Sequence, residues 1–314
     1  MNARRAGRLD VRAPFHLEAT VRVLQRRPLN RVDIWAEDRY VRAIATADGP
    51  VFVEVENRGT IAVPDLRYAV RGGTPSAATL RSLSGTLRRI LGLDVDTQRF
   101  ERLATRDPRL RPQVRALRGM RPPRFPALLE TFVNVIAFQQ LSLDAGVAIV
   151  ARLVERFGER LDHDGGHLFV FPDTRVVAAA PLPALRGCGL SARKAATVRD
   201  IARAIDARKL DEAQIGGMST AEAIRRLLEL PGIGPWSAGL VLLRGFGRLD
   251  VFPPGDVGAA RGVRTLIGLS PAAPLEPVVE RFGDMRGCLY FYALGASLLR
   301  QGLIHRAPDH SGSV

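Results

Sequence analysis

The chain has 314 residues and two cysteines, 46% of its residues are hydrophobic, and its formal net charge is +14. This composition indicates a globular protein long enough for about two domains. Cys188 and Cys288 are too few and too far apart for a disulfide framework, a zinc site or a four-cysteine iron–sulfur cluster. No stretch reaches the roughly 18 consecutive apolar residues of a membrane-spanning helix.

The excess of positive charge favours a polyanionic partner, because basic side chains bind phosphate backbones by displacing counterions. Nearly all of these side chains are Arg, with lysine only at Lys194 and Lys209, so codon usage is an alternative source of part of the bias. The basic N-terminus continues into Asp10 and Arg12 rather than into an apolar signal core. We therefore expect a cytoplasmic protein without a membrane contact.

The first part of the chain has the alternation and the β-branched residues of short strands. Turns at 48–50 and 57–59 then predict an antiparallel meander. Apolar residues with helical spacing follow at 79–91. We predict an N-terminal α+β domain over residues 1–96, with its strands at 19–24, 39–44, 51–56 and 60–63.

From residue 97 onward, helix-like segments separated by Pro and Gly dominate, so the expected fold is mostly α with a small N-terminal antiparallel-sheet domain. A helical domain is predicted over 97–305 and a flexible tail over 306–314. The predicted helices are 126–140, 143–157, 192–207, 220–229, 235–246, 257–267 and 286–301.

Residues 230–238 read Leu-Pro-Gly-Ile-Gly-Pro-Trp-Ser-Ala. Gly232 and Gly234 predict a tight hairpin between one helix and the next, and Pro235 suits the first turn of the second helix. Without Cβ atoms, the glycines let a phosphate approach the free N–H groups at the helix start. The hairpin is therefore predicted to hold a phosphate group.

A Pro/Gly-rich loop at 250–257 follows and presents Asp256 at the start of another helix. A carboxylate in this place suits catalysis, although Asp is also a common helix N-cap. Both roles are compatible with the sequence.

The order hairpin, loop and Asp256 resembles the helix-hairpin-helix DNA glycosylases, and Arg261 stands five residues after Asp256 as in the family pattern. An N-terminal sheet ahead of a helical core is similar to the bacterial 3-methyladenine DNA glycosylase II family, and the resemblance covers nearly the whole chain. It implies that Asp256 is the catalytic carboxylate, that the substrate is double-stranded DNA containing a damaged base, and that no cofactor is needed.

The resemblance also implies DNA contacts from the hairpin and from the segment 136–142. In the family, the turn after the Gln pair carries a side chain that enters the base stack, and Leu141 holds that place. A buried core leucine is the alternative for Leu141. The segment 189–195 also matches the family, although Ser191 there reads equally as a helix N-cap. The predicted DNA-binding residues are Gly232, Ile233, Gly234, Gln140, Leu141, Ser237 and Arg261.

Glycosylases that also cut the DNA strand use an amine, usually a lysine beside the hairpin, as a nucleophile. Trp236 stands there, so the resemblance implies a monofunctional enzyme in which Asp256 stabilises a cation-like sugar. Stacking on aromatic rings suits a flipped, electron-poor base. The predicted base pocket contains Trp236, Leu240, Tyr290 and Tyr292.

Several alternatives stay open at this stage. Leu240 replaces an aromatic residue of the family pattern, so a deaminated or oxidised base is an alternative substrate to an alkylated one. A noncatalytic DNA-binding protein is a third hypothesis, and it is disfavoured by Asp256. No metal site is predicted, since the glycines between His163 and His167 indicate a loop, but hairpin carbonyls are a candidate site for a monovalent cation. We expect a monomer.

Overall fold

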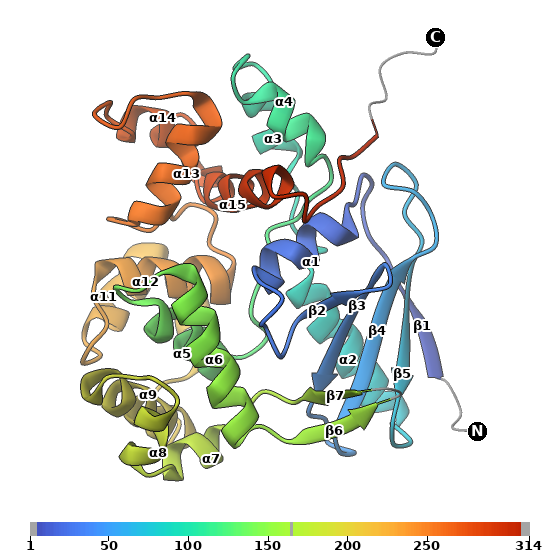
Figure 1. Ribbon diagram of the computed structural model, residues 1–314, viewed down its shortest axis with the longest axis vertical. Helices are drawn as coiled ribbons and strands as arrows, with labels where there is room; N and C mark the ends of the chain where they lie inside the picture. The colour runs from blue at the N-terminus through green and yellow to red at the C-terminus, as the bar shows by residue number, and fades with distance from the viewer. Residues whose placement is uncertain (1–4, 164–165, 309–314) are drawn as a thin grey trace.

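The computed structural model describes residues 5–163 and 166–308 (Figure 1). Its N-terminal part is a five-stranded antiparallel sheet with the strand order β1-β5-β4-β3-β2. The strands are β1 (Arg5–Leu9), β2 (Ile34–Ala36), β3 (Arg39–Ile44), β4 (Val51–Asn57) and β5 (Leu66–Arg71). The predicted strands 39–44 and 51–56 and the turn between them are confirmed.

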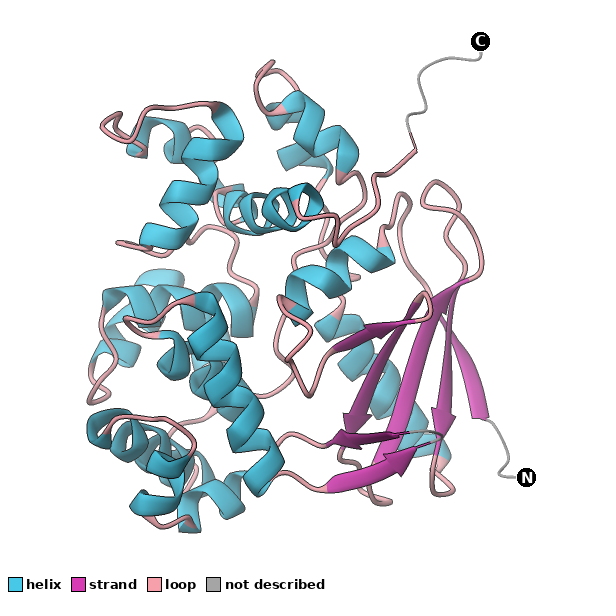
Figure 2. Cartoon of the chain, in the orientation of Figure 1, coloured by secondary structure: helices cyan, strands magenta, loops and turns pink. Residues whose placement is uncertain are grey.

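One face of the sheet is covered by helices, as Figure 2 shows. Helices α1 (Leu17–Gln25) and α2 (Ala77–Ile90) close a core that includes Val53, Val55 and Leu87, all of them fully buried. The prediction of a helix at 79–91 is confirmed, and Ser76 caps it by accepting a hydrogen bond from the Thr79 amide. Apolar residues alternate along β5 because only this face is buried.

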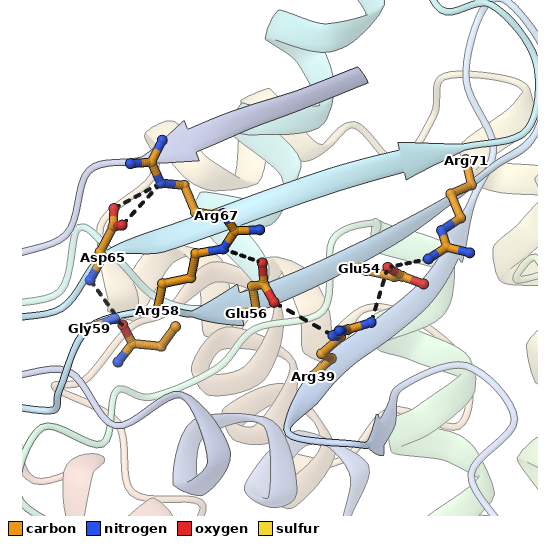
Figure 3. A network of polar contacts seen from close by, with 9 residues as sticks. Arg39, Glu54, Glu56, Arg58, Gly59, Asp65, Arg67 and Arg71 are labelled. Carbon is orange, nitrogen blue, oxygen red and sulfur yellow. Dashed lines mark hydrogen bonds and ion pairs between the residues drawn. The ribbon is translucent and has the colours of Figure 1, made fainter. Parts of the chain in front are cut away.

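The opposite face of the sheet is polar over half of its length. Figure 3 shows alternating charges across the strands: Arg39 lies 3.8 Å from Glu54 and 3.6 Å from Glu56, while Arg71 lies 3.3 Å from Glu54. Arg58 pairs with Glu56 at 2.6 Å. Glu54 is itself buried beside its two arginines, whereas the Arg58–Glu56 pair is largely exposed, and such an exposed pair adds little stability.

Two strand predictions are wrong. Residues 19–24 lie in helix α1, in which every residue except Arg22 is buried, so apolar side chains stand at alternate positions as well as with helical spacing. The ring of His16 caps it by accepting from the Ala19 amide at 3.3 Å. Residues 60–63 form a turn in which Val63 is 74% exposed, and the strand begins only at Leu66.

The rest of the chain is helical, as predicted, and the helices expected at 143–157 and 257–267 have the expected bounds. The segment expected as one helix at 235–246 changes to a π-helical turn at Leu242–Phe246. The helices are α3 (Gln98–Ala104), α4 (Arg111–Ala116), α5 (Leu128–Phe138), α6 (Leu143–Phe157), α7 (Thr174–Ala179), α8 (Leu182–Gly187), α9 (Ala192–Asp206), α10 (Glu212–Gly217), α11 (Thr220–Leu228), α12 (Pro235–Val241), α13 (Val257–Ile267), α14 (Glu276–Glu280) and α15 (Cys288–Arg300).

These helices surround two apolar cores. One core lies among α5, α6, α9 and α12, and the other lies among α3, α4, α13 and α15. In Figure 1 the second group stands above the first. The loop between α12 and α13 links the groups, with Val251 packed in the first core and Phe252 against the second. This crossing places residues 250–256 between the two bodies.

The second part of the chain is not entirely helical. Strands β6 (Arg160–His163) and β7 (Gly166–Phe169) form an antiparallel hairpin where we expected a loop. Leu168 and Val170 pack against Phe52 of β4, on the apolar end of the outer sheet face. Four residues per strand are too few for a clear alternation in the sequence, and the packing partner is remote in the chain.

A buried ion network also joins the two parts. The Arg42 guanidinium of β3 lies 2.7 Å from Asp33 and 2.5 Å from Glu130 of α5, and the Tyr40 hydroxyl donates to Asp33 at 2.7 Å. Burial raises the pKa of Glu130 to about 7, although the nearby Arg42 acts against this shift. The network fixes α5 against the sheet and thereby fixes the turn that follows α5.

The predicted flexible tail begins too early. The Ala307 amide donates to the Ala116 carbonyl at 2.9 Å and Ala307 is buried, so residues 306–308 belong to the fold. Residues 309–314 lie outside the described residues. Within the described ranges, no helix combines the length and the apolarity that crossing a bilayer requires.

Candidate active site and DNA-binding surface

Asp256 is held by two hydrogen bonds at the start of α13. Its Oδ1 accepts from the Ala259 amide at 2.7 Å, which makes it the helix N-cap, and its Oδ2 accepts from Nε1 of Trp236 at 2.9 Å. The N-terminus of a helix interacts favourably with a carboxylate. Both carboxylate oxygens are therefore fixed in direction, and the capping role coexists with a role in chemistry.

The loop that carries Asp256 lies directly on α12. A Cβ atom on Gly239 would stand 3.0 Å from Pro254 Cδ and 3.3 Å from Pro253 Cα, so glycine permits this close approach. The loop is also anchored at its beginning, because the Gly287 amide donates to the Leu249 carbonyl at 2.7 Å. Trp236 and Asp256, twenty residues apart in the chain, meet through this packing.

A cavity of about 570 Å³ opens beside Asp256. The turn after α5, the start of α9, the hairpin and the loop before α13 all contribute to it. Its lining residues are Phe138, Gln139, Gln140, Leu141, Ser191, Arg193, Lys194, Thr197, Gly232, Gly234, Trp236, Ser237, Gly255, Asp256, Val257 and Gly258.

A second cavity of about 1000 Å³ lies between α11, α13 and α14 and shares Gly255, Asp256 and Val257 with the first. Arg261 is exposed and lines this second cavity. The structure thus separates Arg261 from the hairpin residues with which the sequence had grouped it.

The two hairpin glycines differ. Gly232 has a φ of +85°, and a Cβ atom there would stand 2.5 Å from Thr197 Oγ1, so both its conformation and its packing require glycine. Gly234 has a φ of −99°, and the space around its missing Cβ is open. Gly234 thus has an ordinary backbone conformation, and its missing side chain leaves room for a group that approaches from outside.

The turn after α5 presents an apolar side chain to solvent. Leu141 is 44% exposed, so it is not a core leucine. The preceding Gln140 is exposed and has a φ of +55°, which is uncommon for a residue with a side chain. Ser142 then caps α6 by accepting from the Ala145 amide. We call residues 139–142 the wedge turn.

The four residues predicted for the base pocket lie in different surroundings. Leu240 and Tyr292 are 4% and 0% exposed, in the first and second core respectively, and the Tyr292 hydroxyl lies 3.1 Å from Glu101. Half-buried Tyr290 accepts a hydrogen bond from Arg26 at 3.3 Å and is absent from the lining of both cavities. Of the four predicted residues, only Trp236 lines the cavity beside Asp256.

Sequence reasoning missed several residues of this cavity, and three of them bear on its chemistry. Phe138 is its second aromatic residue, and Gln139 and Lys194 form a hydrogen-bonded group in its wall. Lys194 lies far before the hairpin in the chain, outside the window in which we looked for an amine. The matching segments 136–142 and 189–195 contain all three residues and were the available signal.

The side chains of two predicted DNA-binding residues are buried. Ile233 is 5% exposed and belongs to the first core, and Ser237 is 3% exposed with its Oγ accepting from Gln139 at 2.9 Å. These residues can present only backbone to DNA. The Gly232 carbonyl also accepts from Gln139, and a cation at the hairpin carbonyls stays a prediction.

Across the described ranges, no three His, Cys, Asp or Glu side chains gather as a metal site. Cys188 and Cys288 are buried and unpaired with each other. Burial raises the pKa of the Cys288 thiol well above its usual range.

Comparison with known proteins agrees with this geometry. The family model "AlkA N-terminal domain" matches residues 7–126, and the model "HhH-GPD superfamily base excision DNA repair protein" matches residues 133–282. The chain belongs to the helix-hairpin-helix DNA glycosylases. The HhH-GPD match contains the hairpin and Asp256.

Relatives of this glycosylase family agree over most of the chain. A DNA-3-methyladenine glycosylase of Bacillus subtilis is 27% identical over 188 residues, which are 60% of this chain and 62% of that protein. DNA-3-methyladenine glycosylase 2 of Escherichia coli K12 is 28% identical over 79% of this chain and 83% of its own length. The structure of a 3-methyladenine DNA glycosylase from Archaeoglobus fulgidus superposes with a TM-score of 0.75 at 25% identity, covering 95% of this chain and 98% of that one.

Proposed function

We propose that this protein is a monofunctional DNA glycosylase that flips alkylated purines such as 3-methyladenine out of duplex DNA and hydrolyses their N-glycosidic bond. It acts as a monomer on damaged double-stranded DNA in the nucleoid. The observation that carries the proposal is the oriented Asp256 carboxylate, which lines a cavity together with an exposed leucine and the open face of the hairpin.

The geometry suits a dissociative hydrolysis. As the bond between C1′ and the base breaks, the sugar gains positive charge, and the fixed Asp256 carboxylate stabilises that charge. Water adds its oxygen to C1′ and loses a proton to the carboxylate. An N-alkylated purine carries a positive charge and leaves as a neutral base, so no strong general acid is needed.

Two aromatic residues face the space where a flipped base would lie. Trp236 is half-buried and is held by its bond to Asp256, and Phe138 also lines the cavity. The guanidinium of Arg26 already lies 4.8 Å from the centre of the Phe138 ring. Trp236 is therefore the better candidate for stacking on a cationic base.

The monofunctional assignment rests on the state of the amine nearest the site. Lys194 lines the cavity, but its ammonium donates to the Gln139 carbonyl at 2.6 Å and to the Ala137 carbonyl at 3.4 Å. Burial lowers the pKa of Lys194, which by itself favours an amine nucleophile. The two carbonyl bonds oppose this by turning the nitrogen toward the end of α5.

A second candidate is excision of deaminated or oxidised bases. The absence of Tyr290 and Tyr292 from the lining of the cavity favours it, because fewer aromatic faces are then available to a cationic base than the sequence suggested.

The deciding experiment is to incubate the protein with matched duplexes that contain 3-methyladenine, hypoxanthine or 8-oxoguanine and to identify the released bases by mass spectrometry. Release of the alkylated base at the highest kcat/KM is expected. Release of only a deaminated or oxidised base supports the second candidate, and release of none contradicts both.

A further inference from the structure

Three segments that are remote in the sequence meet along one edge of the Asp256 cavity. They are the wedge turn, the start of α9 at 191–194 and the hairpin at 231–236, and each contributes lining residues. The function of the wedge turn depends on its position relative to the hairpin, since both must engage one DNA strand together. The contacts between these segments therefore bear on activity.

The first contact is made by Lys194. Ser191 caps α9 and places Lys194 in its first turn, where the amide of Lys194 donates to Ser191 Oγ at 3.3 Å. Its ammonium reaches the Gln139 carbonyl at 2.6 Å and the Ala137 carbonyl at 3.4 Å. These carbonyls lie at the C-terminal end of α5, where a helix lacks internal donors and favours a cation.

The second contact is made by Gln139. Its Nε2 donates to the Gly232 carbonyl and to Ser237 Oγ, both at 2.9 Å. Gly232 lies in the hairpin and Ser237 in the first turn of α12. One residue thus accepts from Lys194 through its carbonyl and donates to the hairpin through its side chain.

The part of the wedge turn that follows Gln139 is in an unfavourable conformation. Gln140 has a φ of +55° and Leu141 exposes apolar surface, and neither feature is stable without support from the surroundings. Besides the Lys194 and Gln139 bonds, the Leu141 amide donates to the Phe138 carbonyl at 3.3 Å, which is a long bond.

We infer that Lys194 is a positioning residue, which acts through Gln139 to hold the wedge turn in register with the hairpin while a base leaves the stack. This inference rests on the proposed wedge role of Leu141. The Lys194–Gln139 pair is called the strut below. The strut is required for flipping a paired base and not for the hydrolysis of a base that is already unstacked.

The variant Lys194→Met removes the ammonium and keeps an unbranched side chain, and Lys209→Met is the matched control because Lys209 is exposed. Excision is measured on a lesion opposite its normal partner and on the same lesion opposite an abasic site, where flipping costs less. Lys194→Met should lose on the order of tenfold or more on the paired lesion and be close to wild type on the other, since hydrogen bonds to a charged group are lost. Equal losses on both substrates overturn the inference.

Two further measurements separate the strut from the wedge. Leu141→Ala should reduce excision of the paired lesion by a smaller factor in Lys194→Met than in the wild type, because both changes act on base flipping. Equal factors in the two backgrounds would contradict the strut. Amide hydrogen exchange at 139–142 should accelerate in Lys194→Met and not in Lys209→Met, and this holds whether or not any base is excised. Unchanged exchange overturns the strut, whereas a Leu141→Ala enzyme with wild-type activity overturns only the wedge.

Discussion

The indole nitrogen of Trp236 donates to Oδ2 of Asp256 at 2.9 Å, and this bond joins the hairpin helix α12 to the loop that carries the carboxylate. One element that is proposed to contact DNA thus orients the group that is proposed to act on the sugar. A shift of the hairpin on binding would be passed to the carboxylate directly. The bond also explains why a tryptophan suits a position where lyases of this family carry an amine.

Asp256→Asn should reduce base release by at least about a hundredfold, because the charge that stabilises the transition state is lost. Asn is itself a good helix N-cap, so the fold and the start of α13 should be retained. Duplex affinity should change little, since the charge acts mainly in the transition state. Single-turnover release and fluorescence anisotropy check the two parts, and wild-type turnover would remove Asp256 from the chemistry.

Trp236→Phe tests the bond itself. The variant keeps an aromatic ring and loses the N–H donor to Asp256, so turnover should fall by about one order of magnitude, as expected for a hydrogen bond to a charged acceptor. The fall should be similar for all bases that the enzyme excises. A loss confined to cationic bases would instead assign Trp236 a stacking role alone.

The product should be an intact abasic strand. Lys194 is the only lysine in the lining of the Asp256 cavity, and its ammonium is bound to backbone carbonyls. Borohydride should therefore trap no covalent adduct with DNA, and strand breaks should need alkali. If an adduct is trapped, loss of trapping in Lys194→Met would identify Lys194 as the amine. A trapped adduct, or strand breaks without alkali, would make the enzyme bifunctional.

How much the sequence could predict depended on how local each feature is. The hairpin, the loop and the position of Asp256 at the start of α13 were predictable, because each is encoded in a short run with glycines, prolines and a cap. The pocket walls were not: Leu240 and Tyr292 are buried by remote packing, and Phe138 and Lys194 approach Asp256 only in the folded chain. Helix α1 was read as a strand because Ala19, Val21 and Val23 alternate with polar residues, a pattern that a helix buried on nearly every side tolerates.

Stability at low pH should depend on Asp107, which links the chain before α4 to the end of α14. Hydrogen bonds from Arg109, and then from Arg281, hold the pKa of this carboxyl well below its usual range, although burial acts in the opposite direction. A depressed pKa stabilises the fold above the ordinary value of about 4, and this contribution is lost as the pH falls below it. Asp107→Asn should lower Tm at pH 7 and have a smaller effect at pH 2–3. An equal loss at both pH values would contradict the ionic origin.

The two hairpin glycines should respond differently to the same substitution. Gly234→Val places its side chain in open space at an ordinary φ, so the protein should fold normally with a Tm near that of the wild type. Gly232→Val meets Thr197 and an unfavourable φ, and it should lower Tm markedly or prevent folding. Thermal unfolding of the two variants checks this contrast.

Gly234→Val should nevertheless bind DNA weakly, because the branched side chain stands where a phosphate must approach the helix start. Since the contact is to the backbone, affinity should fall by a similar factor for damaged and undamaged duplex. Wild-type affinity should also fall steeply with salt, and less steeply in the variant, if one phosphate contact is lost. Titrations of both duplexes at two salt concentrations are decisive: unchanged affinity of the folded Gly234→Val variant would show that the hairpin is not the DNA anchor.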